Sequence, residues 1–142
     1  MQEHGLKISE LVTLFNLEVL NRGSDYDTAL LTITDVNRPG LQFHSFYDYF
    51  DPRRLQVLGK AEITYLKGLT TEQRRKCFDD LFLYDIPALV ISRGLDCFPE
   101  CLESARVHER TLLRTEETTV EFTSHTIEYL NRVLAPCVTR HG

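Results

Sequence analysis

The sequence predicts an α/β fold with a mixed, largely parallel sheet flanked by helices. From Pro87 onward, the pattern alternates strand, helix, strand and helix, which is typical of βαβ units in a parallel sheet. Residues 88–91 are continuously apolar, as in a strand that is covered on both faces. Thr-x-x-Gln at 70–73 and Thr-x-x-Glu at 118–121 have the capping-box pattern that opens a helix. Right-handed crossovers are the natural way to assemble these elements.

The N-terminal part is predicted to hold one helix and two clear strands. Apolar residues at helical spacing predict a helix over Ser9–Asn16. The short apolar run Leu17–Leu20 follows and stops at a turn cluster. Apolar and β-branched residues that alternate with threonines predict a strand over Ala29–Thr34. A second strand is predicted over Arg54–Leu58, and Gly59 ends it.

The segment between these two strands contains a turn dipeptide and an aromatic run. Pro39 fixes its own φ, and Gly40 can adopt a positive φ, so the pair is predicted to be the centre of a type II turn. Four aromatic residues within Phe43–Phe50 have the spacing of one helical face, although aromatic residues also favour strands. We interpret this run as core packing and not as a platform for stacking bases.

The C-terminal part is predicted to alternate helices and strands. The expected elements are a helix over Ala61–Lys67, a helix opened by Thr70, a strand over Ala88–Ile91, a helix from Pro99 to about His108, a strand over Thr111–Arg114 and a helix opened by Thr118. Gly68 is expected to be the C′ residue of the first of these helices, and Pro136 to end the last one.

Size and charge limit the classes of function. The chain has 142 residues, which suits one domain. Its net charge of −5 argues against a protein that mainly grips nucleic acid, because such proteins usually present a basic surface. No apolar run approaches the roughly 20 residues of a membrane span, and residues 1–7 lack the pattern of a signal peptide. We therefore expect a cytoplasmic protein with no membrane contact.

Four cysteines are present, and their spacing does not predict a metal site. They are Cys77, Cys97, Cys101 and Cys137. No pair has the Cys-x-x-Cys spacing, and no histidine lies at zinc-finger spacing from them. Cys97 and Cys101 would lie one helical turn apart, but Pro99 stands between them. We expect all four to be reduced thiols and no metal to be bound.

Several segments in a fixed order resemble one protein family. They include Leu17–Leu20, the stretch from Asp35 to Gly59, Leu69–Arg75, Pro87–Leu95, Leu113–Thr115 and Tyr129–Pro136. Each segment alone is a weak signal, but their order and spacing resemble the N-terminal domain of bacterial HPr kinase/phosphorylase. At the level of the fold, that domain is also similar to the N-terminal domain of the muramoyl-peptide ligases, which holds a uridine nucleotide.

The resemblance implies a domain that is separate from the chemistry of its parent enzyme. It implies an N-terminal domain over residues 1–136, with 137–142 as the start of a linker into a P-loop kinase domain. The sequence itself has no Gly-x-x-x-x-Gly-Lys-Ser/Thr run to cradle phosphates. The resemblance further implies that His141 is catalytic in the full-length protein, since His141-Gly142 matches the opening of the kinase domain. These 142 residues alone are expected to be non-catalytic and to need no cofactor.

For the full-length protein, the resemblance implies a homo-hexameric serine kinase. It would phosphorylate the phosphocarrier HPr with ATP or pyrophosphate and Mg²⁺, and would reverse this step by phosphorolysis, in carbon catabolite repression. This chain would contribute assembly contacts and effector sensing. The alternative is a stand-alone sensor of phosphometabolites with the same fold. An independent enzyme ranks last, because no spacing singles out a nucleophile and base.

The residues themselves suggest an anion site at the carboxyl edge of the sheet. Ligands of open α/β sheets bind beyond the carboxyl ends of the strands. Three predicted strands end close to an arginine, namely Arg38, Arg93 and Arg114. If the strands are parallel, the three guanidinium groups can face one crevice and bind a phosphometabolite by bidentate hydrogen bonds. Gly40 and Gly94 would permit close approach of the backbone.

A structural role for these arginines is the competing interpretation. Each arginine has a carboxylate nearby in the sequence with which it can pair, namely Asp35, Asp96 or Glu116. Surface pairs of this kind contribute little to stability. The two interpretations differ in geometry, because only the first requires the guanidinium groups to converge.

Overall fold

A five-stranded mixed sheet forms the centre of the fold. The computed structural model describes residues 4–135. The strand order is β2-β7-β6-β5-β4, and β2 is antiparallel to β7 while the other neighbours are parallel. The strands are β2 (Glu18–Asn21), β4 (Val36–Asn37), β5 (Leu55–Leu58), β6 (Leu89–Ile91) and β7 (Leu112–Arg114). A separate pair is formed by β1 (Leu6–Lys7) and β3 (Leu30–Leu31), which are antiparallel.

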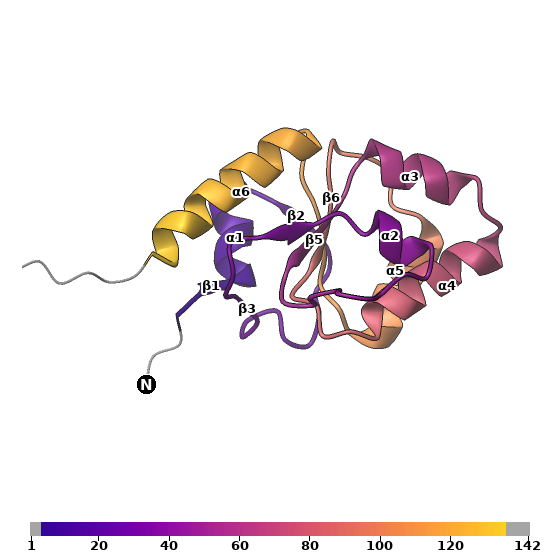
Figure 1. The fold of residues 1–142 in the computed structure, drawn as a ribbon, viewed down its shortest axis with the longest axis horizontal. Helices are drawn as coiled ribbons and strands as arrows, with labels where there is room; N and C mark the ends of the chain where they lie inside the picture. The colour runs from indigo at the N-terminus through magenta and orange to yellow at the C-terminus, as the bar shows by residue number, and fades with distance from the viewer. Residues whose placement is uncertain (1–3, 136–142) are drawn as a thin grey trace, which may run out of the picture.

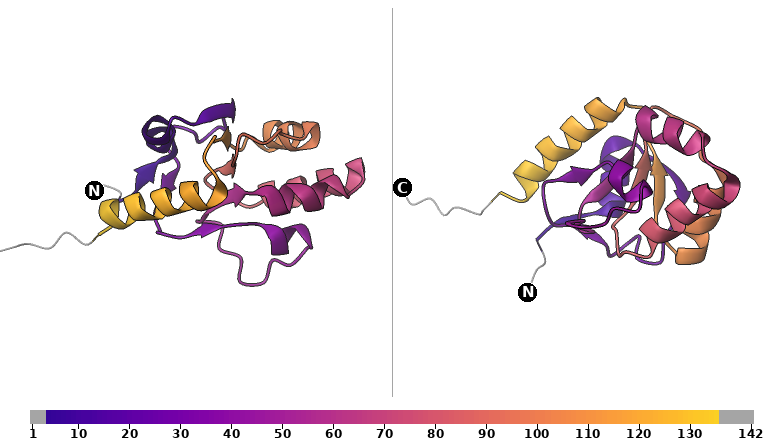
Figure 2. Two further views of the ribbon diagram at one scale, coloured as in Figure 1. Left: turned by 90° about the horizontal axis from the view of Figure 1, so that it is seen from above. Right: turned by 45° about the vertical axis from the view of Figure 1, so that its right-hand side comes forward.

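Helices cover both faces of this sheet. They are α1 (Ile8–Phe15), α2 (Gly40–Phe43), α3 (Lys60–Lys67), α4 (Thr71–Phe82), α5 (Pro99–His108) and α6 (Thr119–Val133). In Figure 1, α1 and α6 lie on one side of the sheet, and α2 to α5 lie on the other. The two views in Figure 2 show the same separation. The fold is therefore a three-layer α/β/α arrangement, which confirms the fold class predicted from the sequence.

Two hydrophobic cores fill the spaces between the layers. Alternate residues of each central strand point to opposite faces. Leu58 and Leu89 pack with α2 to α5, whereas Val57 and Val90 pack with α1 and α6. Since all four are fully buried, the central strands are apolar on both faces. This explains why a continuous apolar run is a reliable sign of β6.

The parallel strands are wound in one direction only. β4, β5, β6 and β7 are neighbours in the same order as they occur in the sequence. Right-handed crossovers between them therefore place α2 to α5 on one face. After β7 the chain reverses and places α6 on the opposite face. At the carboxyl ends of the parallel strands, a helix from each layer is therefore present only where α6 begins, next to the start of α3.

The helix starts that the sequence predicted are confirmed. The hydroxyl of Thr70 accepts a hydrogen bond from the backbone N–H of Gln73, and that of Thr118 accepts one from Glu121, both at 3.1 Å. Both capping boxes are complete. Pro99 is the first residue of α5, where its missing N–H costs least.

The predicted strand Ala29–Thr34 is largely wrong. Only Leu30 and Leu31 form a strand, and they pair with β1 outside the main sheet. The ladder covers only two residues of this segment, because β1 offers only two residues to pair with. The strand that precedes Arg38 in the main sheet is β4, which the sequence did not reveal.

The predicted type II turn and the C′ glycine are also wrong. Pro39 (φ −80°, ψ 36°) precedes α2, and the Phe43 N–H donates to the Pro39 carbonyl at 3.0 Å in helical fashion. Gly40 is the first residue of that helix and has no positive φ. Gly68 is right-handed at φ −79°, so α3 ends without a left-handed residue.

The aromatic run does not form one helical face. Positive φ values at Ser45 (66°) and Tyr49 (64°) break it after α2. Phe43 is in the core, whereas the Phe46 side chain is 43% exposed. Tyr47 packs partly against the core and stacks on Tyr84 with ring centroids 4.8 Å apart. Core packing is thus confirmed for only part of the run.

Candidate functional site

The starts of α3 and α6 meet above the carboxyl ends of β5 and β6. Ser92 follows β6, and its hydroxyl donates to the Leu58 carbonyl at 2.8 Å. The same hydroxyl lies 2.6 Å from the Thr119 hydroxyl at the start of α6. Gly59, which precedes α3, is packed so closely that an added Cβ would lie 2.5 Å from the Thr119 Oγ1. We call the group Arg38, Gly59, Glu62, Ser92 and Thr119 the junction. Figure 1 shows the starts of α3 and α6 next to each other at the top of the molecule.

A nearly buried carboxylate organises the junction. Glu62 Oε1 accepts hydrogen bonds from the Gly59 N–H at 2.6 Å and from Arg38 Nε and Nη2 at 3.2 and 2.9 Å. Glu62 is 9% exposed and Arg38 is 44% exposed. The guanidinium of Arg38 therefore keeps an open side, and its Nη1 has no partner among the described residues. That open side is where an anion would find donors.

Arg93 and Gly94 form a strained corner next to the junction. Both have φ 60°, a conformation that costs a residue with a side chain about 1–2 kcal/mol. The Arg93 N–H donates to the Glu117 carbonyl at 2.7 Å, and the Gly94 N–H donates to the Thr115 carbonyl at 2.8 Å. These bonds hold the corner while the Arg93 side chain is exposed. Strain of this kind often occurs at functional sites.

The close approach at Gly94 is to a carboxylate. A Cβ at this position would lie 2.6 Å from Glu116 Oε1, so the glycine makes room for an acidic side chain. A Cβ added at Gly40 would meet nothing within 4 Å, and this residue has no positive φ, so its surroundings do not require glycine. The sequence hypothesis gave both glycines the role of admitting a ligand, and neither environment supplies a reason for that role.

Arg114 lies apart from the junction. Its Nε and Nη2 contact Glu18 of β2 at 2.9 Å, and its Nη1 donates to the Leu95 carbonyl at 3.2 Å. β5 and β6 lie between β4 and β7, so the ends of those two strands are roughly 14 Å apart. The guanidinium groups of Arg38 and Arg114 pair with different carboxylates, Glu62 and Glu18. Within residues 4–135, the hydrogen bonds and ion pairs of the three arginines share no partner.

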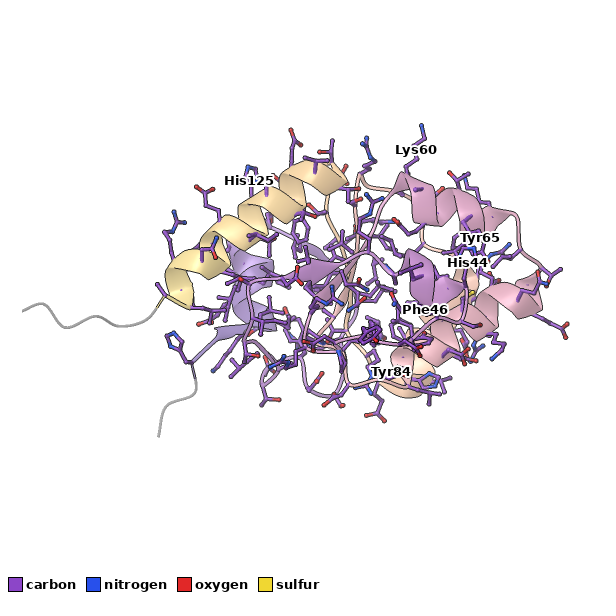
Figure 3. All side chains as sticks on the ribbon, in the orientation of Figure 1. His44, Phe46, Lys60, Tyr65, Tyr84 and His125 are labelled. Atoms are coloured by element: carbon purple, nitrogen blue, oxygen red, sulfur yellow. The ribbon has the colours of Figure 1, made fainter. Side chains whose placement is uncertain are left out.

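Two polar side chains lie on the helices that begin at the junction. Lys60, the first residue of α3, is exposed. His125 of α6 lies with its Nδ1 2.8 Å from Glu117 Oε2, and its side chain is half exposed. Figure 3 labels both of them on the upper surface of the molecule. His141 and the predicted linker 137–142 lie outside the described residues.

The sequence hypothesis missed four junction residues, namely Gly59, Glu62, Ser92 and Thr119. The Gly59…Glu62 spacing has the pattern of a helix start with an acidic third residue, and this signal was available. Ser92 and Thr119 gave none, because their contact joins residues that are 27 positions apart.

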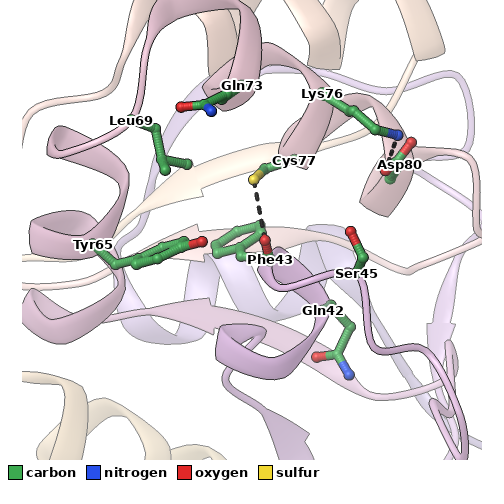
Figure 4. A pocket seen from close by; sticks show the side chains of 9 residues that line it. All are labelled: Gln42, Phe43, Ser45, Tyr65, Leu69, Gln73, Lys76, Cys77 and Asp80. Carbon is green, nitrogen blue, oxygen red and sulfur yellow. Dashed lines mark hydrogen bonds and ion pairs between the residues drawn. The ribbon is translucent and has the colours of Figure 1, made fainter.

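A cavity apart from the junction lies between the α2 segment and the helices α3 and α4. Its volume is about 190 Å³, and Figure 4 shows its lining. The Cys77 thiol donates to the Phe43 carbonyl at 3.4 Å, and Lys76 pairs with Asp80 at 2.9 Å. Burial raises the pKa of Cys77, so this thiol is a poor nucleophile. The polar groups at this cavity are thus largely paired with the protein itself.

Residues 4–135 hold neither a membrane-spanning helix nor a cluster of metal ligands. None of the helices in this part of the chain is long and apolar enough to cross a membrane. In the same residues, no three His, Cys, Asp or Glu side chains are grouped closely enough to hold a metal ion.

The fold and the junction define a three-layer α/β domain with a charged, hydroxyl-lined carboxyl edge. The model of the family "HPr Serine kinase N terminus" matches residues 6–130, and the chain belongs to that family. HPr kinase/phosphorylase of Alkaliphilus metalliredigens is 40% identical over 137 residues, which are 96% of this chain and 44% of that protein. The protein of the same name from Clostridium tetani is 41% identical over 138 residues, which are 97% of this chain and 45% of that protein. The chain thus spans less than half the length of these relatives.

A solved structure shares the fold at low sequence identity. It is described as the CBS and DRTGG domains of the regulatory region of Clostridium perfringens pyrophosphatase, complexed with the activator diadenosine tetraphosphate. The TM-score is 0.61 and the identity 13%, over 94% of this chain and 54% of that one. This similarity shows that the same arrangement of helices and strands occurs in a protein of very different sequence.

Proposed function

We propose that this chain is the regulatory and assembly domain of an HPr kinase/phosphorylase. The observation that carries the proposal is the match to such proteins over 96% of this chain but only 44% of theirs. The family is described by the words "N terminus", which supports a domain that precedes the catalytic part. The absence of a P-loop sequence from the 142 residues agrees with a non-catalytic role.

The proposed parent is a cytoplasmic homo-hexamer that acts on a protein substrate. It transfers phosphate from ATP or pyrophosphate, with Mg²⁺, to a serine of HPr, and removes that phosphate by phosphorolysis. In this proposal, residues 1–136 are the domain, 137–142 lead into the P-loop domain, and His141 acts in the catalytic site of the whole protein.

We further propose that the carboxyl edge senses a phosphorylated effector. Arg38 offers its open side at the junction, and the exposed Arg93 directly follows the junction residue Ser92 in the chain. In this proposal, Arg38 and Arg93 bind a phosphate group, and Arg114, which lies three strands away from β4, binds another part of the effector. The proposal keeps Gly40 and Gly94 as neighbours of this site and gives the binding of the anion to the guanidinium groups.

Phosphotransfer assays test the main proposal. The 142-residue chain is incubated with HPr, Mg²⁺ and either ATP or pyrophosphate, and the complete gene product is assayed beside it. We expect phosphoserine on HPr only with the complete gene product. Phosphotransfer by the 142 residues alone would contradict the proposal.

The second candidate is a stand-alone sensor with the same fold. It is favoured by the similar structure, which is described as part of a regulatory region with a bound nucleotide activator. Fold alone does not carry function, so this support is by analogy. The codons after Gly142 discriminate between the two candidates, since a P-loop encoded downstream supports the kinase and its absence supports the sensor.

Binding of sugar phosphates or nucleotides, with Arg38→Gln as the comparison variant, tests the effector site under either candidate function.

A further inference from the structure

A hollow lies between the end of α3 and the loop that joins β6 to α5. Its volume is about 320 Å³, near the lower end of the roughly 300–1,000 Å³ that ligand sites occupy. Apolar side chains form part of its lining. Ile63 is 5% exposed, and Leu95 and Phe98 pack partly against the core. The hollow shares no lining residue with the junction, so it is a second candidate site, of a size that suits a small metabolite.

One arginine holds both walls of the hollow in place. On the α3 side, Arg74 donates from Nε to the Leu66 carbonyl at 3.0 Å and from Nη2 to the Leu69 carbonyl at 2.8 Å. On the α5 side, its guanidinium lies 4.6 Å from the centre of the Phe98 ring, and its Nη1 pairs with Glu100 at 2.8 Å. Because these contacts are made within the domain, the hollow is formed before any ligand binds.

Two charges of opposite sign line the hollow. Lys67 is the last residue of α3, and Asp96 lies in the loop after β6. Neither side chain belongs to any ion pair within residues 4–135. The sequence offers Asp96 as a partner for a nearby arginine, but no such pair forms in this part of the chain. An ammonium and a carboxylate are therefore available to the charged groups of a ligand.

We propose that this hollow binds a free α-amino acid with an apolar side chain. Such a ligand carries both groups that the hollow can pair, because its carboxylate accepts from the Lys67 ammonium and its ammonium donates to the Asp96 carboxylate. Its side chain lies against Ile63, Leu95 and Phe98, where contact removes apolar surface from water. The site is separate from the proposed phosphate site and does not depend on it.

Titration of the 142-residue protein with L-leucine, followed by ¹H–¹⁵N NMR, tests this proposal. We expect saturable shifts of the backbone amides around Lys67 and from Leu95 to Phe98. Two analogues are matched probes, since isoamylamine is leucine without the carboxylate and isocaproate is leucine without the ammonium. Each analogue should bind roughly tenfold more weakly than leucine, because each loses one charge-assisted contact.

Two variants identify which charge pairs with which group of the ligand. Lys67→Gln should bind L-leucine roughly tenfold more weakly, but isoamylamine no more weakly than the wild type does. Asp96→Asn should weaken L-leucine binding in the same way and leave isocaproate binding undiminished. Both residues are exposed, so neither change removes a core contact. Lys60→Gln makes the same change of charge at the other end of α3, and this control should bind leucine as the wild type does.

Three results would overturn the proposal. The first is the absence of saturable shifts at the hollow when L-leucine is added. The second is binding of isoamylamine or isocaproate to the wild type as tightly as leucine. This measurement needs no variant, so it stands even if a substitution disturbs the fold. The third is L-leucine binding that both Lys67→Gln and Asp96→Asn leave unchanged.

Discussion

Replacing Glu62 with alanine should destabilise the domain through a backbone group. Glu62 Oε1 is the acceptor for the buried Gly59 N–H at 2.6 Å and for two nitrogens of Arg38. Alanine removes this acceptor, and water cannot readily replace it because Gly59 is buried. The substitution thus leaves the first backbone N–H of the α3 start without a partner.

The expected loss follows from the burial of each partner. A buried N–H without an acceptor costs about 1–3 kcal/mol. The ion pair adds little, because Arg38 is 44% exposed and its charge is screened by solvent. We therefore expect Glu62→Ala to lower the free energy of unfolding by about 2 kcal/mol, most of it from Gly59.

Urea unfolding followed by far-UV circular dichroism measures this loss. Glu62→Gln is the matched control, since it retains an oxygen acceptor for Gly59 and removes only the charge. We expect it to cost less than about 1 kcal/mol. The reasoning fails if both variants lose the same stability, or if Glu62→Ala loses less than about 0.5 kcal/mol.

Three other substitutions or titrations test neighbouring features. Gly59→Ala should cost about 1–3 kcal/mol in urea unfolding, because its Cβ would overlap Arg38 Nη2 and lie 2.5 Å from Thr119 Oγ1. Arg93→Gly should raise the thermal midpoint by relieving about 1 kcal/mol of left-handed strain. Asp51 should titrate near pH 2 by NMR, because hydrogen bonds from the side chain and backbone of Arg53 lower its pKa from 3.8 to about 2. Its stabilising effect is then present above pH 3.8 and is lost as the pH falls toward 2, and Arg53→Ala should return its pKa toward 3.8.

Elements that depend on local signals could be predicted from the sequence. The capping boxes at Thr70 and Thr118 place α4 and α6, since the bonds involved span three residues. The strand β3 could not be placed in this way. Its length and its sheet depend on β1, a segment more than twenty residues away that carries no signal of its own. Pairing across long separations is a tertiary effect that overrides local preference.

For the candidate site, too, the sequence could indicate residues with a local signal but not their partners across long separations. The arginines were found because arginine near a strand end is a readable pattern. Their partners were not found, because Glu62 is 24 residues from Arg38 and Glu18 is 96 residues from Arg114. The sequence offered nearer carboxylates, but chain proximity does not decide which charges meet in the fold. Arg38 and Arg114 are thus paired with carboxylates, as the competing interpretation expected, but the partners are Glu62 and Glu18.

The winding of the sheet limits where a ligand can sit. In open α/β sheets, ligands bind at the carboxyl ends of the strands, at the point where the strand order reverses and the following helices change face. The strands from β4 to β7 follow one another in sequence order, so the strand order does not reverse between Arg38 and Arg114. The helices change face only when the chain leaves β7 for α6, and α6 begins beside α3, where Thr119, Ser92 and Gly59 meet. A ligand at this edge would therefore be centred on the junction, to which Arg38 belongs.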